Sequence, residues 1–178
     1  AQVDTVMGYG WTHSYNIFLF NQRGHMFRMD GDGRVTKYQL GTGGKFTPTP
    51  GYFETLVKNP DGTFTLTQKD KTVFHFASIP NTPFMVGGPV YRLTSIVDRN
   101  NNTTTLNYTS GNLDTITDFC GRNLNLSYNG QNKLVSIKDP LNRTITLEYD
   151  STGKKLLKVT DPEGNSIQYS YNFMYQLT

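Results

Sequence analysis

Residues 134–149 read LVSIKDPLNRTITLEY, and residues 156–171 repeat the same pattern as LLKVTDPEGNSIQYSY. The shared unit is a leucine, an isoleucine or valine three positions later, an aspartate two positions after that, and a tyrosine ten positions beyond the aspartate. Two earlier copies make an array of four units that start 20 to 22 residues apart. The repeat residues are Leu93, Asp98 and Tyr108; Leu113, Asp118 and Tyr128; Leu134, Asp139 and Tyr149; and Leu156, Asp161 and Tyr171. Repeats of this length decide the architecture of a chain, so the fold is read from them first.

Each repeat aspartate opens a turn. Its side chain can accept a hydrogen bond from the backbone two residues later, and the third residue after it is of a type that tolerates a positive φ. Those third residues are Asn101, Gly121, Asn142 and Gly164. The pattern predicts a tight hairpin turn, of type I followed by a bulge, with positive φ at all four positions.

A strand follows each turn. In the third unit Ile145, Leu147 and Tyr149 alternate with Thr146 and Glu148, and this period of two indicates a strand with one apolar face. The leucine and the isoleucine that open a unit are three residues apart, which would place them on opposite faces of a regular strand. Either the leucine precedes a β-bulge, or both faces of the sheet are partly covered.

Residues 1–92 show the same alternation less regularly. Strands are expected near 14–20, 25–29, 34–40, 63–67 and 72–76, with loops at 41–51 and 79–89, and no segment has helical periodicity. The predicted fold is an all-β antiparallel meander of short hairpins in an open, twisted single sheet. We read one continuous domain: an N-terminal hairpin region at 1–92, four repeats at 93–176, and the start of a truncated fifth repeat at 177–178. The chain is therefore expected to be a segment of a longer protein.

Composition narrows the functional classes. The 178 residues carry 17 Lys and Arg against 14 Asp and Glu, a net charge of +3, without the basic stripe that is typical of nucleic-acid binding. No stretch approaches the roughly 20 apolar residues of a membrane-spanning helix. A single cysteine excludes an intrachain disulfide. We therefore expect no nucleic-acid partner and no membrane span.

The residues able to carry chemistry are few and scattered. His13, His25 and His75 form no metal-binding or catalytic motif, and Cys120 has no Cys-His signature around it. Residues 30–33, DGDG, fail as an EF-hand loop because the fifth and sixth loop positions are Arg34 and Val35. The sequence therefore predicts no catalytic residues, no metal site and no cofactor.

The repeat resembles the YD repeat of Rhs-family proteins, most closely at 134–149 and 156–171. Residues 7–15, MGYGWTHSY with Trp11 at the centre, resemble the GxGW segment that commonly precedes such repeats. Residues 62–66 and 70–76 resemble the short hairpins found between the two. The first two turns, at 98–101 and 118–121, depart from the pattern because no proline follows the aspartate.

The resemblance implies a structural role. In bacterial Rhs polymorphic toxins, insecticidal toxin-complex subunits and teneurins, such repeats build a spiralling β-sheet that closes into a hollow shell, which in the toxins holds a C-terminal effector domain. The chain would then be a non-catalytic, N-terminal segment of a larger β-shell in a secreted or cell-surface bacterial protein. Its partners would be the rest of the parent chain and that effector.

Two further hypotheses remain. The chain has 11 tyrosines, and a tyrosine-rich β-surface suits a carbohydrate-binding or cell-surface adhesion module with a glycan as partner. Because the tyrosines recur with the repeat, stacking of neighbouring units is the more economical explanation.

The strand at 166–172 has an apolar face and lacks protective Lys or Pro, so the isolated chain is expected to self-associate through this edge as a homodimer.

Overall fold

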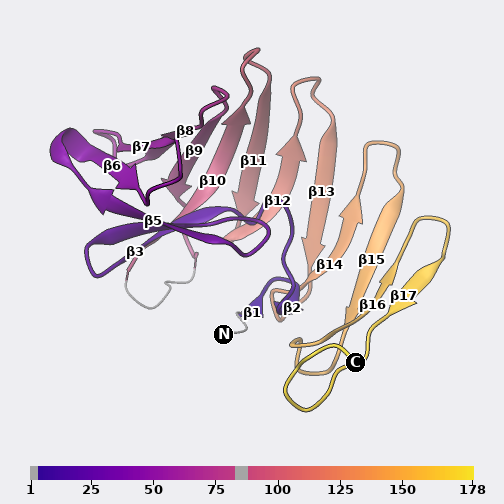
Figure 1. Ribbon diagram of the computed structural model, residues 1–178. Coiled ribbons are helices and arrows are strands. Elements are labelled where there is room, and N and C mark those ends of the chain that lie inside the picture. Colours follow the sequence, from indigo (N-terminus) through magenta and orange to yellow (C-terminus); the bar gives the residue numbers. More distant parts are fainter. Residues whose placement is uncertain (1–3, 83–87) are drawn as a thin grey trace. The chain divides into compact units, whose positions relative to one another are not determined.

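The computed structural model describes residues 4–82 and 88–178, which form two compact units. One unit comprises residues 14–121, and the other comprises residues 122–178 together with the N-terminal segment up to His13. Both are built almost entirely of antiparallel strands (Figure 1), so the predicted all-β meander is confirmed. The described chain contains no helix with the length and hydropathy needed to cross a membrane.

The unit of residues 14–121 holds ten strands and one 3₁₀ turn in its described part. They are β3 (Phe18–Gln22), β4 (His25–Met29), β5 (Val35–Leu40), η1 (Thr42–Gly44), β6 (Lys45–Pro48), β7 (Thr55–Lys58), β8 (Phe64–Thr67), β9 (Val73–Ser78), β10 (Val90–Val97), β11 (Thr103–Thr109) and β12 (Asn112–Thr117). The stretch 41–51, expected as a loop, therefore contains η1 and β6. In the expected loop 79–89, residues 83–87 lie outside the described residues.

Eight of these strands close into a barrel, which corrects the prediction of an open single sheet. Strand β10 pairs along one edge with β9, and on its other edge Val90–Arg92 pair with Phe18–Phe20 of β3. The last residues of β10, Ser95–Val97, pair instead with β11. Because β10 is eight residues long, it can close the barrel at its start and continue the meander at its end.

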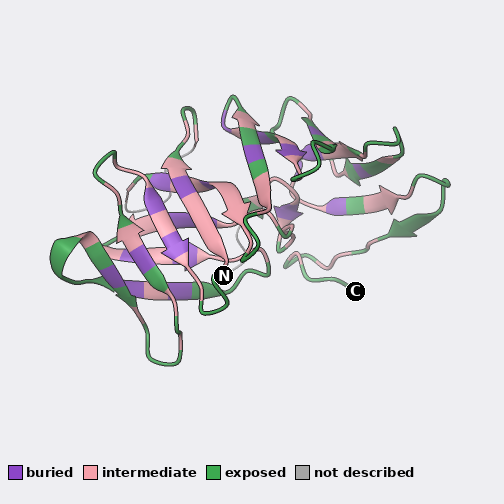
Figure 2. Cartoon of the chain, turned by 90° about the horizontal axis from the view of Figure 1, so that it is seen from above, coloured by how far each residue is buried: buried purple, intermediate pink, exposed green. Residues whose placement is uncertain are grey.

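The barrel interior is filled by large apolar side chains. Every second side chain along a barrel strand points inward, and Figure 2 shows buried residues interspersed with exposed and half-buried ones along the strands. The most deeply buried are Leu19, Leu56, Phe64, Leu66, Phe76 and Leu93. The first repeat leucine thus belongs to the barrel core.

The second unit contains the last two repeats. Its strands are β1 (Asp4–Thr5), β2 (Gly8–Tyr9), β13 (Asn123–Tyr128), β14 (Leu134–Lys138), β15 (Thr144–Tyr149), β16 (Leu156–Thr160) and β17 (Ser166–Gln168). Strands β13 to β17 pair antiparallel in chain order, and β1 pairs with β2. The three residues of β17 are exposed, and association through this edge stays a prediction.

A β-bulge resolves the spacing of leucine and isoleucine. In the third repeat, Leu134 pairs with Tyr128 while Ser136 pairs with Ser127, so Val135 is an extra residue on its strand. The same register shift follows Leu93, Leu113 and Leu156. The extra residue rotates the strand, so that the leucine and the isoleucine three positions later face the same side. Of the two alternatives left open by the sequence, the bulge is the one that forms.

Candidate functional site

The repeat aspartates act as turn caps. In the third repeat, Asp139 Oδ1 accepts hydrogen bonds from the backbone N–H groups of Leu141 at 2.8 Å and Arg143 at 2.9 Å. The Asn142 N–H donates to the Asp139 carbonyl at 3.0 Å, which closes the turn. Equivalent bonds cap the turns that begin at Asp98, Asp118 and Asp161. The aspartate therefore supplies the acceptor that fixes the turn.

The charge of these aspartates is stabilised by the same bonds. The Asn102 side chain, followed by the turn N–H groups, holds the pKa of Asp98 below its usual value. In the fourth repeat the Asn165 side chain does the same for the pKa of Asp161. Hydrogen bonds to the ionised form favour it over the neutral form. The lowered pKa thus has a structural cause, without a metal or a substrate.

The third residue of each turn has the predicted positive φ. The angle is 64° at Asn101, 79° at Gly121, 66° at Asn142 and 89° at Gly164. A Cβ at Gly164 would meet no atom within 4 Å, so any cost of substitution there comes from the backbone angle alone.

Gly164→Val is expected to lower the free energy of unfolding by about 1–2 kcal/mol, because a β-branched residue is strongly disfavoured at positive φ. Gly164→Asn is the matched control, and its effect should stay within about 0.5 kcal/mol because asparagine tolerates this region. Urea unfolding of the two variants measures the difference. Equal midpoints would show that the turn does not constrain this residue.

The repeat tyrosines bind the repeat leucines. The Tyr149 hydroxyl donates to the Leu134 carbonyl oxygen at 2.7 Å, and Tyr149 itself pairs across the strands with Leu156. Tyr108 donates likewise to Leu93 at 2.8 Å, and Tyr171 to Leu156 at 2.7 Å. Each of these tyrosines thus satisfies the carbonyl of the leucine 15 residues earlier, where the bulge has disturbed the ladder.

Aspartate and tyrosine of one repeat lie apart. Asp139 lies in the turn before β15, and Tyr149 is the last residue of that strand. The structure therefore brings tyrosines together with leucines at one end of the strands and leaves the aspartates at the other. The constant spacing of ten residues corresponds to the turn plus one strand, and the aspartate and tyrosine of one repeat form no shared site.

Burial of the tyrosines predicts a loss of stability in alkali. Burial raises the pKa of Tyr108 to about 12, from an ordinary value near 10. The folded chain therefore keeps a proton that the unfolded chain releases, and stability is fully present below pH 10 and falls as the pH rises toward 12. The expected loss from this group is up to about 3 kcal/mol. Urea unfolding at several pH values measures it, and Tyr108→Phe should flatten the dependence; an unchanged slope would contradict the assignment.

A buried ionic cluster in the barrel was not predicted. Arg28 of β4 is 4% exposed; its Nε lies 2.7 Å from Asp30 Oδ1, and its Nη1 lies 2.8 Å from both Glu54 Oε2 and the Tyr38 hydroxyl. Tyr38 donates in turn to Glu54 Oε1. The sequence did contain a signal, because Arg28 lies two residues after Met26 on the same strand and therefore shares its inward-facing side.

Every charge in this cluster has a charged or polar partner. Burial by itself would lower the pKa of Arg28, but Tyr38, Asp30 and Glu54 together outweigh it and raise that pKa. Burial raises the pKa of Tyr38 as well, and Glu54 adds to the shift. The cluster therefore holds Arg28 as a cation and Tyr38 as a neutral phenol, which makes it a set of fixed hydrogen bonds between strands.

A cavity of about 340 Å³ lies beside the cluster and is lined by Arg28 and Asp30 of the cluster together with Ser14, Ile17, Asp32, Arg34, Leu66 and Phe74. Its charged groups are bonded to one another: Arg34 lies 3.4 Å from Asp30 and 3.8 Å from Asp32. Cavities with a few polar groups are common ligand sites, but the charges lining this one are already paired.

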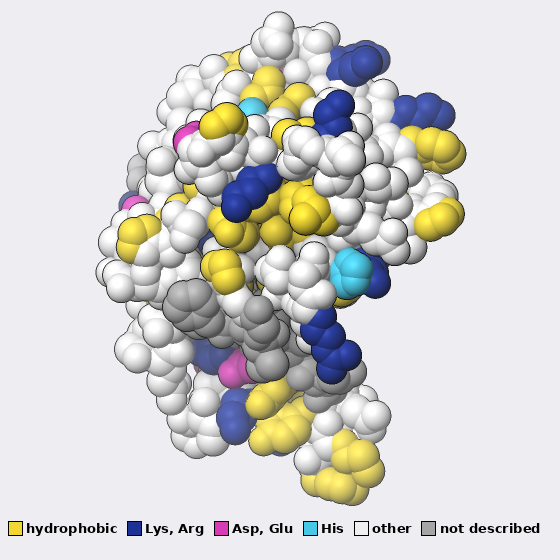
Figure 3. Space-filling view, turned by 90° about the vertical axis from the view of Figure 1, so that its left-hand side faces the viewer, with side chains coloured by type: hydrophobic (Ala, Val, Ile, Leu, Met, Phe, Trp, Pro, Cys, Tyr) yellow, Lys and Arg dark blue, Asp and Glu magenta, His cyan; other side chains and the backbone are white. Residues whose placement is uncertain are grey.

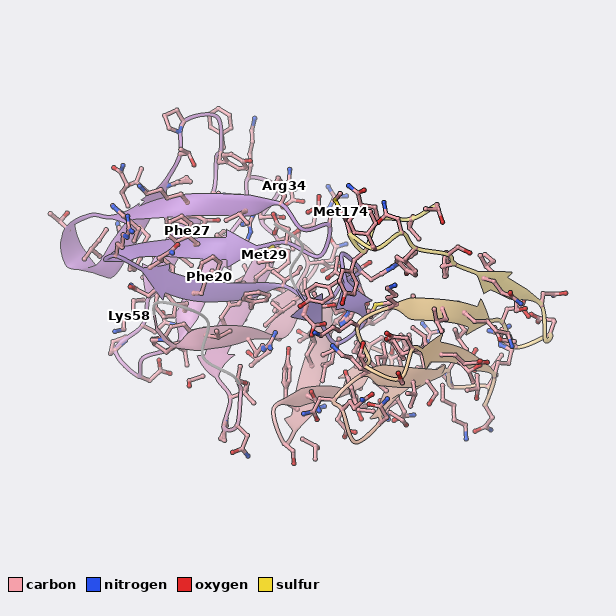
Figure 4. The ribbon with its side chains drawn as sticks, turned by 90° about the horizontal axis from the view of Figure 1, so that it is seen from below. Phe20, Phe27, Met29, Arg34, Lys58 and Met174 are labelled. Carbon is pink, nitrogen blue, oxygen red and sulfur yellow. The ribbon has the colours of Figure 1, made fainter. Side chains whose placement is uncertain are left out.

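The outer side of the barrel carries an apolar strip. Phe20 of β3 and Phe27 of β4 pair across the strands, with ring centroids 5.3 Å apart and an interplanar angle of 17°. Figure 4 labels both residues and also Met29, which lies further along β4. On the face shown in Figure 3, lysine and arginine side chains lie scattered among hydrophobic and polar ones and form no stripe.

The histidines and the cysteine lie in separate places. His75 of β9 lies with its Nδ1 3.4 Å from Thr65 Oγ1, and Cys120 is exposed in the second repeat turn. His25 begins β4, and His13 precedes the barrel. In the part of the chain that the structure describes, no three His, Cys, Asp or Glu side chains are grouped so as to hold a metal ion.

Trp11, singled out by the sequence although it precedes the repeats, contacts the fourth repeat. Its Nε1 donates to the Tyr171 hydroxyl at 2.7 Å, and its ring centroid lies 4.7 Å from that of Tyr169.

Neither a family model nor a curated protein matches the chain.

Proposed function

We propose that this chain is a non-catalytic wall segment of an Rhs-type, YD-repeat β-shell, which encloses or presents a C-terminal effector domain of a secreted or cell-surface protein. The observation that carries the proposal is the construction of the repeat itself. A turn cap, a bulge and a tyrosine-to-leucine bond recur with the sequence unit. A module of this kind adds strands one hairpin at a time, as an extended wall requires.

The barrel supports a starting role in such a wall. Repeat arrays need capped ends, because an exposed strand edge is a template for pairing with other chains. The first repeat begins in β10, and the barrel occupies both edges at the start of this strand. The wall would therefore have a closed beginning and would extend only toward later repeats.

The test begins with the coding sequence that follows residue 178. The proposal expects further units with the same spacing of leucine, aspartate and tyrosine, followed by a domain without them. Electron microscopy of the parent protein should then show a hollow shell, and limited proteolysis should leave the last domain intact. A coding sequence without further repeats, or a parent protein with an open and fully digested structure, would refute the shell.

A glycan array distinguishes the adhesion hypothesis. The isolated chain is expected to bind no glycan specifically, because the rings of Trp11 and Tyr169 pack on each other and the Tyr171 hydroxyl is bonded within the protein. Saturable binding of one glycan class, abolished by Trp11→Ala but not by Tyr52→Ala on the barrel, would replace the shell proposal with a binding module.

A further inference from the structure

The N-terminal residues 4–11, here called the strap, lie on the repeats of their own unit. Figure 1 shows β1 and β2 of the strap beside the start of β14. The strap belongs to the same compact unit as residues 122–178, yet residues 14–121 separate the two along the chain. Its attachment to the repeats is therefore entirely non-covalent, and it is made at three places.

The first attachment is at the bulge of the third repeat. Strand β15 pairs with Ser136–Lys138 and not with Leu134, which leaves the Leu134 N–H for another acceptor. The carbonyl oxygen of Val6 accepts it at 2.8 Å. Next to it, the buried Nζ of Lys133 lies 2.6 Å from Asp4 Oδ1 and donates to the Thr5 carbonyl oxygen at 2.8 Å.

The second attachment requires glycine at position 8. The Tyr9 N–H donates to the Lys154 carbonyl oxygen at 2.8 Å. Gly8 is buried with a φ of 88°, and a Cβ there would lie 2.6 Å from the same oxygen. Any other residue at this position would combine a disfavoured backbone angle with a clash against backbone.

The third attachment is aromatic. Trp11 contacts Tyr169 and donates to the Tyr171 hydroxyl, as described above, and the Tyr9 ring lies 5.1 Å from the Tyr175 ring. The Lys155 ammonium group lies over both Tyr171 and Tyr175, at 6.0 and 5.2 Å from the ring centroids. The receiving residues on the repeats, here called the seat, are Lys133, Leu134, Lys154, Tyr169, Tyr171 and Tyr175.

The same kind of contact occurs in the other unit. There the Leu93 N–H, at the bulge of the first repeat, donates to the carbonyl oxygen of Ile17 at 3.3 Å. Ile17 directly precedes β3, so this bond continues the pairing of β10 with β3 that closes the barrel. In both repeats the leucine N–H at the bulge is thus bonded by a segment that precedes the repeats in the chain, which is a barrel strand in the first repeat and the strap in the third.

We propose that the seat is a peptide-binding site and that the strap is exchangeable, so that the strap of a second copy of this chain can occupy it. The contacts suit exchange, because they are backbone bonds, one ion pair, one glycine and two aromatic contacts, all made by one short segment. Exchange of identical segments between copies requires no new complementarity. This inference does not depend on the shell proposal.

A labelled peptide of residues 1–13 tests the site. It is titrated into the full chain carrying Gly8→Val, in which the chain's own strap cannot seat, and fluorescence anisotropy follows binding. We expect saturable binding of the wild-type peptide and at least tenfold weaker binding of a Gly8→Val peptide. The wild-type chain should bind the peptide at least tenfold more weakly than the variant chain, because its own strap competes at an effective concentration of the order of millimolar.

Equal binding of the two peptides would overturn the proposal, as would absence of binding to a variant chain that keeps its strand signal in circular dichroism. Hydrogen exchange in the wild-type chain gives a test that needs no variant. An exchangeable strap exposes the Leu134 amide at least tenfold more often than global unfolding does, and excess peptide should slow this exchange. If the Leu134 amide exchanges only through global unfolding, the strap is fixed and the proposal fails.

Discussion

Arg28→Met is expected to lower the free energy of unfolding by about 3–5 kcal/mol, which would be the largest effect of any single polar substitution in the barrel. Removing the guanidinium leaves the Glu54 carboxylate buried with only the Tyr38 hydroxyl as a described partner. A buried charge without its counter-charge costs far more than the pair contributes. Urea unfolding of the wild type and the variant measures the difference.

Two controls distinguish burial from charge. Arg34→Met removes a cation whose side chain is 57% exposed, so its effect should stay within about 0.5 kcal/mol. Adding Glu54→Gln to Arg28→Met should restore at least half of the loss, because the carboxylate that lacked a counter-charge is then gone. If Arg28→Met and Arg34→Met cost the same, the cluster does not stabilise the barrel.

Tyr149→Ala should lower the free energy of unfolding by about 3 kcal/mol or more, as truncations of large packed aromatic residues do. The loss combines the ring, which pairs across the strands with Leu156, and the hydroxyl bond to the Leu134 carbonyl. Tyr149→Phe separates the two parts, because it keeps the ring and should cost only about 1 kcal/mol.

Thr146→Ala is the matched control on the same strand. Thr146 is exposed on the opposite face of β15, and its loss should stay within about 0.5 kcal/mol. Chemical unfolding of the three variants decides the matter. Similar midpoints for Tyr149→Ala and Thr146→Ala would mean that the repeat tyrosine does not hold neighbouring strands together.

Local structure could be predicted well from this sequence. The aspartate and the residue three positions later encode a turn, and the alternation that follows encodes a strand, all within about ten residues. The structure has the turn at Asp139–Asn142 and the strand at β15. The bulge after Leu134 is one of two structures compatible with the sequence, because the spacing of leucine and isoleucine alone does not determine which face is covered. Only the pairing of Leu134 with Tyr128 decides it.

Long-range structure could not be predicted in the same way. Closure of the barrel depends on Val90 pairing with Phe20, which are 70 residues apart, and no local pattern records such a pairing. The ion pair of Arg28 with Glu54 also forms only in the fold, and nothing in the local sequence around either residue indicates its partner. The strap contacts of Val6 and Trp11 lie more than 120 residues from their partners along the chain.

Those separations set an order of events during synthesis. Hairpins β13–β14 and β15–β16 pair neighbouring residues, so each can form soon after it leaves the ribosome. The barrel must wait for β10 before β3 has its second neighbour. Residues 4–11 are made more than 120 residues before their partners Leu134, Lys154 and Tyr171. The strap is therefore translated before the barrel but finds its place after it, and until then it is free to be taken up by a neighbouring nascent chain.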